Sequence, residues 1–163
     1  MSSGYNRMKF QNSSDIKQLA EERFLAFLKE QGARKTPERM ATLRCVYEMV
    51  GHFEVDQLYA KLLKESPGIS RATVYNTLEL LLRAKLVMKL QFGENRAYYE
   101  RTIGAKQHDH LICNQCQQLL EFCDPGIQQI KDQMGEILQF HITHHTLILY
   151  GDCKKKSCPN LMK

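Results

Sequence analysis

Apolar residues recur every three or four positions over residues 15–84, and this period predicts helices. The first helix spans residues 15–31 and is followed by Gly32. The second begins at Pro37, a proline in the first helical position that follows the capping hydroxyl of Thr36, and it continues through the apolar Val50. Both helices therefore carry an apolar stripe that can pack in a core.

Two further helices follow with the same period. The third begins near Glu54 and ends before the helix-breaking Pro-Gly pair at 67–68. The fourth runs over residues 71–84 and directs its leucines inward, which leaves Thr77 among the polar and aromatic residues of the outward face.

From residue 88 the period changes to two. Apolar and polar residues alternate over 88–92, a turn falls at Gly93-Glu94-Asn95, and residues 96–100 return as the second strand of a hairpin. Helices followed by a hairpin are typical of a winged helix-turn-helix, which we assign to residues 1–100. Residues 101–107 have no clear period and are the predicted hinge.

Residues 108–163 predict a second, smaller α/β unit. Its strands are expected at 109–113, 118–122 and 145–150, with an amphipathic helix over about 125–139. A unit of this size has a thin core, so a bound metal ion or a second copy of the chain is expected to stabilise it. The predicted fold class is α+β, with an N-terminal winged helix-turn-helix and a small α/β dimerisation domain.

The composition agrees with a folded, soluble protein. Hydrophobic residues make up 43% of the 163 positions, and no apolar run approaches the length of a membrane-spanning helix, so no membrane partner is expected. The N-terminal residues lack an apolar signal segment, which predicts a cytoplasmic location. Residues 1–100 hold 16 basic and 12 acidic groups, an excess that permits contact with a polyanion without requiring it.

Four of the six cysteines form two close pairs. The turn in Cys113-x2-Cys116 brings two sulfurs to one side, and Cys153-x4-Cys158 supplies a second pair. In a reducing compartment, such pairs indicate a metal site rather than disulfides. Four thiolates close the coordination shell, so we predict structural Zn²⁺; four unrelated reduced cysteines are the alternative.

His108-Asp109-His110 begins a predicted strand, where a period of two places both imidazoles on one face and Asp109 on the other. From these residues alone, a metal site and a solvent-exposed pair both remain open. Cys45 lies on the apolar side of the second helix and is expected to be a buried small hydrophobe. Cys123 is the candidate for a redox-reactive thiol.

Three short motifs carry a resemblance. They are Thr-Pro-Glu-Arg at 36–39, Ser-Arg-Ala-Thr-Val-Tyr at 70–75 and His-Asp-His-Leu-Ile-Cys-Asn-Gln-Cys at 108–116. Together they resemble the ferric uptake regulator family of metal-responsive repressors, over residues 14–158. The resemblance implies a homodimer that represses transcription by binding a palindromic operator in double-stranded DNA when divalent metal is bound, and therefore no enzyme.

The resemblance also implies a regulatory site, which maps onto His52, Glu100, His108, His110 and Glu121. Mixed imidazole and carboxylate ligands suit Fe²⁺, Mn²⁺, Co²⁺ or Zn²⁺. Glutamate at both carboxylate positions favours iron, because the peroxide-sensing branch of the family favours aspartate there. Since two ligands precede the hinge and three follow it, one ion would hold the domains at the angle that two DNA half-sites require.

The family's further metal site maps onto Gln107, Asp109, Gln128 and His145. Two of these four positions are neutral amides, which are poor donors to transition metals. We therefore predict that this third site is weak or absent, although Asp109 and His145 can still interact.

The fourth helix is the implied recognition helix, whose early residues face base edges in the major groove. Tyr75 is the best candidate for a base contact. Asn76 stands where many relatives have arginine, and its amide favours adenine through a paired donor and acceptor. The candidate DNA-binding residues are Arg34, Lys35, Arg39, Ser70, Arg71, Thr73, Tyr75 and Asn76.

Other functions remain open. Within the family, the protein could sense peroxide through oxidation of a metal-bound histidine, or it could sense zinc or manganese. Outside the family, a metalloenzyme could use the same histidines and carboxylates with an open coordination position. No nucleophile motif, phosphate loop or His-Glu-x-x-His supports that reading. A zinc-ribbon scaffold without sensing is the remaining alternative.

Overall fold

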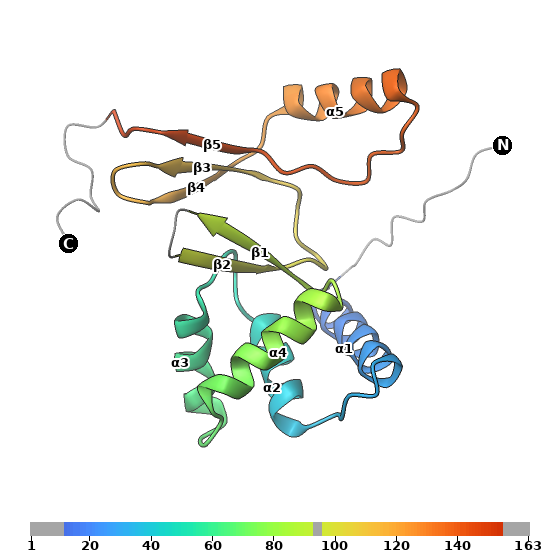
Figure 1. The fold of residues 1–163 in the computed structure, drawn as a ribbon, viewed down its shortest axis with the longest axis vertical. Helices are drawn as coiled ribbons and strands as arrows, with labels where there is room; N and C mark the ends of the chain where they lie inside the picture. The colour runs from blue at the N-terminus through green and yellow to red at the C-terminus, as the bar shows by residue number, and fades with distance from the viewer. Residues whose placement is uncertain (1–11, 93–95, 155–163) are drawn as a thin grey trace. The chain divides into compact units, whose positions relative to one another are not determined.

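The computed structural model describes residues 12–92 and 96–154. The chain divides between Ala105 and Lys106 into two compact units (Figure 1). In the described residues the first has four helices and a two-stranded sheet, and the second has one helix and a three-stranded sheet. In the described ranges, no helix combines the length and the apolar character needed to cross a membrane.

The first unit contains four helices and a hairpin. Its elements are α1 (Ser13–Glu30), α2 (Pro37–Val46), α3 (Val55–Glu65), α4 (Arg71–Arg83), β1 (Val87–Phe92) and β2 (Arg96–Arg101). The two strands pair antiparallel, with Val87 opposite Arg101. This is the winged helix-turn-helix that the sequence predicts; the turn predicted at 93–95 lies outside the described residues.

Local capping explains why the helices begin where the sequence predicts. The Thr36 hydroxyl accepts a backbone N–H in the first turn of α2 at 3.3 Å, and the Ser70 hydroxyl accepts the N–H of Thr73 at 3.1 Å. Before α3, the Gln57 side chain accepts the N–H of Glu54 at 2.9 Å. Each contact satisfies a backbone N–H at the start of a helix, which has no carbonyl acceptor one turn earlier in that helix.

Two sequence-based predictions for this unit are wrong. The second helix ends at Val46 rather than Val50, whose side chain is 92% exposed. Beyond Val46 the backbone tightens, because the N–H of Glu48 bonds the Cys45 carbonyl three residues back at 3.1 Å. The N–H of Met49 is shared between the Cys45 and Val46 carbonyls, at 3.2 and 3.1 Å. Thr77, expected on the outward face, is buried; its hydroxyl donates to the Thr73 carbonyl at 2.7 Å and so has a partner inside the helix.

The core of the first unit draws on every helix. The clearest examples, one from each of α1 to α4, are Phe24, Leu43, Leu58 and Leu81. The buried Tyr47 hydroxyl donates to the Leu86 carbonyl at 2.9 Å, which ties the end of α2 to the start of the hairpin. Helix α4 and the hairpin are therefore held by one continuous core.

The second unit is built on a three-stranded sheet in the order β4-β3-β5, with α5 beside it in the chain. Its elements are β3 (Asp109–Cys113), β4 (Leu119–Phe122), α5 (Pro125–Leu138) and β5 (Ile148–Gly151). Strand β4 pairs antiparallel to β3 and β5 pairs parallel to it. The last strand begins later than predicted, since the N–H of Leu147 donates to the Asp109 carboxylate at 3.1 Å instead of joining the ladder.

The amphipathic helix of the second unit is present, but no described residue of α5 is buried. Large apolar side chains of α5, of the segment that follows it and of strands β4 and β5 remain exposed. They are Leu120, Ile130, Met134, Ile137, Leu138, Phe140, Leu149 and Tyr150.

Candidate metal centres and DNA-binding face

The turn after β3 brings two cysteines together. Hydrogen bonding from the backbone N–H of Cys116 lowers the pKa of Cys113 to about 7, against the opposing effect of burial. The backbone of Cys153 contributes in the same direction, because β5 brings Gly151 opposite Cys113 in the parallel pair. A low pKa favours the thiolate that binds Zn²⁺. The predicted fourth ligand, Cys158, lies outside the described residues, so the four-cysteine site stays a prediction.

His52 is placed beside Glu100 by a short contact between two segments of the first unit. Phe53 and Tyr99 exchange backbone hydrogen bonds of 2.9 and 2.8 Å in an antiparallel bridge. The bridge brings their neighbours together, so that His52 Nε2 lies 3.4 Å from Glu100 Oε2. An imidazole and a carboxylate therefore meet at one edge of the wing.

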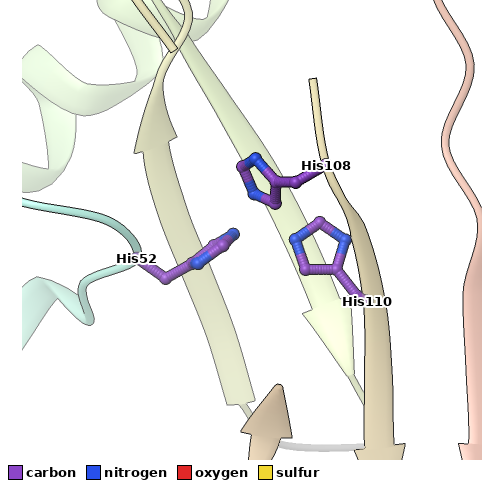
Figure 2. A group of neighbouring side chains, drawn as sticks. All are labelled: His52, His108 and His110. Atoms are coloured by element: carbon purple, nitrogen blue, oxygen red, sulfur yellow. The ribbon is translucent and has the colours of Figure 1, made fainter. Parts of the chain in front are cut away.

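In the second unit, His108 and His110 project from the start of β3 to the same side, as the period of two predicts (Figure 2). Their ring centroids are 4.9 Å apart, with the ring planes at 75°. His110 pairs with Glu121 of β4 in the antiparallel register, and residues directly opposite share a face of the sheet. Asp109, between them in the strand, instead accepts the N–H of Leu147 at 3.1 Å.

These two groups have the chemistry of a transition-metal site. One offers an imidazole and a carboxylate, and the other offers two imidazoles and a carboxylate, which suits Fe²⁺, Mn²⁺, Co²⁺ or Zn²⁺. Such ions take about four to six ligands. Each group by itself is therefore too small to fill a coordination shell.

The four residues of the third predicted site make polar contacts with other groups of the protein. His145 Nε2 lies 3.3 Å from Asp109 Oδ1, so the expected interaction between these two residues is present. The Gln107 amide donates to the His145 carbonyl at 3.0 Å, and the Gln128 amide donates to Asp132 of its own helix at 2.9 Å. These contacts agree with a weak or absent site, which stays a prediction.

The two remaining cysteines differ in environment. Cys45 is fully buried, and burial raises its pKa to about 11, as expected for an inert thiol. Cys123 is exposed, and its thiol donates to the Gln107 carbonyl at 3.0 Å. A redox role for Cys123 stays a prediction.

Helix α4 presents three of its predicted DNA contacts, Arg71, Tyr75 and Asn76, on the surface. Tyr75 is 45% exposed, and Asn76 is exposed beside it. The Ser70 and Thr73 hydroxyls lie 2.8 Å apart, while Ser70 also caps the helix. These hydroxyls therefore use some of their hydrogen bonds to stabilise the start of α4.

The basic residues before α2 are organised by Arg39. Its guanidinium donates to the Arg34 carbonyl, which stabilises the turn that carries Arg34 and Lys35. The side chains of Arg34 and Lys35 are exposed. Arg39 therefore supports the basic turn.

Arg71, the first residue of α4, is held by two residues of α3. Its Nη2 lies 2.6 Å from Asp56 Oδ1, and its guanidinium carbon lies 5.5 Å from the centre of the Tyr59 ring. The contacts of Asp56 and Tyr59 with Arg71 were not predicted, because they depend on how α3 packs against α4. The only sequence signal was a carboxylate and an aromatic residue three positions apart on one helix.

Comparisons with known proteins agree with this arrangement. The sequence profile of the ferric uptake regulator family matches residues 30–150. The peroxide-responsive repressor PerR of Staphylococcus aureus (strain USA300) is 32% identical over 134 residues, covering 82% of this chain and 89% of that protein. The chain belongs to the ferric uptake regulator family.

Solved structures of ferric uptake regulators have the same fold. The Vibrio cholerae protein is 30% identical with a TM-score of 0.62, covering 77% of this chain and 96% of that one. The Pseudomonas aeruginosa protein, solved with manganese, is 25% identical with a TM-score of 0.69, covering 80% and 98%. The predicted α+β class is thus confirmed, and the protein is a metal-responsive transcriptional regulator rather than an enzyme.

Proposed function

We propose that this family member is an iron-responsive repressor that binds a palindromic operator as a homodimer when its regulatory metal is bound. The observation that carries the proposal is the division of one mixed ligand set between two units. His52 and Glu100 belong to the DNA-binding unit, whereas His108, His110 and Glu121 belong to the second unit. Neither group is large enough to complete a shell alone.

This division accounts for metal-dependent DNA binding. Ligands from both units that share one ion would narrow the range of angles between the units, and a dimer needs a particular angle to reach two half-sites. The coupling is reciprocal, so operator DNA would tighten metal binding by the same factor. The Vibrio cholerae relative, described as showing a rearrangement of its DNA-binding domains, supports this view.

The other metal sites have separate roles in this proposal. Cys113, Cys116, Cys153 and Cys158 would hold a structural Zn²⁺ that keeps the second unit folded. Fe²⁺ would be the regulatory ion, with Mn²⁺, Co²⁺ or Zn²⁺ able to substitute. The predicted hinge at 101–107 would be the segment whose motion the regulatory ion restricts.

The exposed apolar side chains of α5 and the neighbouring strands support the homodimer. A folded monomer rarely exposes a large apolar surface, and a second copy of the same surface would cover it. Two copies of α4 would then meet two half-sites of a palindrome. A repressor of this kind acts where the operator is, so we propose a cytoplasmic location.

In the DNA complex, Tyr75 and Asn76 would contact base edges in the major groove. Arg34, Lys35 and Arg71 would contact phosphates or the minor groove, where positive charge adds affinity without reading sequence directly. Arg39, Ser70 and Thr73 would act mainly by supporting these contacts, because each already makes a structural hydrogen bond.

The test measures operator binding with and without metal. The wild-type protein, with zinc retained, selects a palindromic duplex from a random pool, and its affinity is then titrated under Fe²⁺, Mn²⁺ and Zn²⁺ without oxygen. Metal should tighten binding by about 10- to 100-fold, the usual range of allosteric coupling. His108→Ala combined with His110→Ala should abolish that gain, whereas His141→Ala combined with His144→Ala, at exposed histidines of the same unit, should retain it. Equal affinity of the apo and metal-loaded forms would disprove the proposal.

Peroxide sensing is the second candidate function, because the chain is 32% identical to the Staphylococcus aureus peroxide-responsive repressor. Oxidation of a ligand histidine by ferrous iron and peroxide should then release the operator, while the manganese-loaded protein stays bound. Mass spectrometry would detect the added oxygen atom on His52, His108 or His110. Unmodified histidines together with unchanged operator affinity after peroxide treatment would favour iron sensing alone.

A further inference from the structure

The first residue of α4 is seated on α3. Asp56 and Tyr59 stand three positions apart, so they lie on one face of their helix. The carboxylate of Asp56 bonds the Arg71 guanidinium at 2.6 Å, and the Tyr59 ring lies 5.5 Å below it. A single cation thus has both a charged and an aromatic partner on the neighbouring helix.

The contacts with Asp56 and Tyr59 offset the unfavourable position of the Arg71 charge. Arg71 places a positive side chain at the amino end of α4, which is already the positive end of the helix dipole, and the first turn of α4 contains no acidic residue. Asp56 supplies the missing negative charge from α3. The ion pair therefore neutralises the one basic side chain at the start of the implied recognition helix.

The pair is also at the surface where DNA is expected. The Arg71 side chain is 54% exposed and the Asp56 side chain is 66% exposed. A phosphate that approaches Arg71 therefore meets the adjacent carboxylate within about 10 Å, the screening distance at 0.1 M salt. Removing one unit charge at roughly 6 Å in water changes a binding constant by about threefold.

We propose that Asp56 is a specificity-determining residue that lowers affinity for non-operator DNA by neutralising Arg71. The inference rests on the proposed function as a sequence-specific repressor. On random DNA, Arg71 is an ion pair with little net charge and adds little attraction. At the operator, base contacts by Tyr75 and Asn76 fix α4 in the groove. The Arg71 guanidinium has five N–H donors, so it can bond a phosphate there while it keeps its hydrogen bond to Asp56.

The experiment compares Asp56→Asn with a matched control. Asparagine keeps an oxygen that can accept from Arg71 but removes the charge. The control is Asp132→Asn, which makes the same change at an exposed aspartate of α5 that is also paired with a basic residue, Lys131 at 3.6 Å. Manganese-loaded full-length proteins are titrated against the palindrome selected by the wild type and against a duplex of the same composition in scrambled order.

At roughly 50 mM salt, Asp56→Asn should bind the scrambled duplex more tightly than the wild type does, by about threefold for each protomer that contacts the DNA. Its operator affinity should rise less, so the ratio of operator to scrambled affinity falls. The difference should shrink at higher salt. Asp132→Asn should change neither affinity, and matching thermal midpoints would show that all the proteins remain folded.

A second pair of variants assigns the effect to Arg71. In the Arg71→Ala background, Asp56→Asn should give a smaller gain on the scrambled duplex than in the wild type. An equal gain in both backgrounds, equal effects of Asp56→Asn and Asp132→Asn, or weaker binding of Asp56→Asn to both duplexes would each overturn the inference. Failure of the wild type to select any sequence would instead disprove the proposed repressor function.

Discussion

The two units of this protein differ sharply in how they bury apolar side chains. The first unit has a core that draws on four helices and the hairpin. In the second unit, Ile112 and Cys113 are the apolar residues that the described part of the chain buries, while eight large apolar side chains are exposed. The first unit thus encloses its own hydrophobic core, whereas the second exposes many of its large apolar side chains to solvent.

This contrast indicates what each unit needs in order to fold. Burial of whole side chains such as Phe24 supplies the first unit with stabilisation from its own residues. A unit of fewer than about 60 residues with an exposed helix lacks that source, and it needs a metal ion or a partner chain. The DNA-binding unit is therefore expected to be stable alone, and the second unit to depend on what it binds.

Removal of the zinc ligands should produce the largest effect. Cys113→Ser should unfold the second unit, because structural Zn²⁺ contributes on the order of 10 kcal/mol to folding. Limited proteolysis should then digest that unit and leave a fragment of the first unit, with loss of zinc confirmed by metal analysis. Cys123→Ser, at an exposed cysteine, should retain both zinc and resistance. Wild-type resistance in Cys113→Ser would contradict the prediction.

Truncation of the first core should have the next largest effect. Phe24 is completely buried, so Phe24→Ala should lower the free energy of unfolding of that unit by about 3–5 kcal/mol. Urea denaturation with a probe in the first unit measures the change. A loss below about 1 kcal/mol would show that this core is not the main source of stability.

A charge on the exposed apolar face should separate the protomers. Ile137 is 68% exposed in α5, and Ile137→Asp should weaken dimerisation by about 2–4 kcal/mol if a second copy covers it. Sedimentation equilibrium measures the dissociation constant. The control is Val50→Asp, at a valine of the first unit that is 92% exposed and should leave the dimer intact. Equal effects of the two substitutions would argue against this face as the interface.

The smallest expected effect concerns the buried thiol of the first core. Burial raises the pKa of Cys45 from 9.0 to about 11, so the folded state favours the neutral thiol. The resulting stabilisation is complete below about pH 9 and is lost as the pH rises through the folded value. Urea denaturation from about pH 8 to pH 11 should show a decline that Cys45→Ala reduces. Identical pH profiles for the two proteins would exclude this contribution.

Much of the fold could be predicted because its signals are local. Thr36 and Ser70 cap helices through contacts three residues away, and the alternation over 88–92 marks the first strand of the hairpin. The prediction for Val50 was wrong because the apolar residues keep the helical period past Val46, whereas the helical backbone ends there. Thr77 was misplaced because its polarity suggests exposure, although its hydroxyl is satisfied within α4.

The candidate site was predictable only in part. The alternation of His108, Asp109 and His110 correctly placed both imidazoles on one side of the strand. His52 and Glu100 carry no local signal, and their assignment came from the resemblance to a family. The seat of Arg71 on Asp56 was not predicted at all.

The sequence by itself determined the helix starts, the strand alternation and the types of metal ligand, since these follow from interactions within a few residues. Only the tertiary structure decided that Phe53 would pair with Tyr99 and bring His52 to Glu100, and that α3 would place Asp56 against Arg71. Such contacts join segments distant in the chain. They depend on how helices and strands pack around a shared core, and no local period encodes that packing.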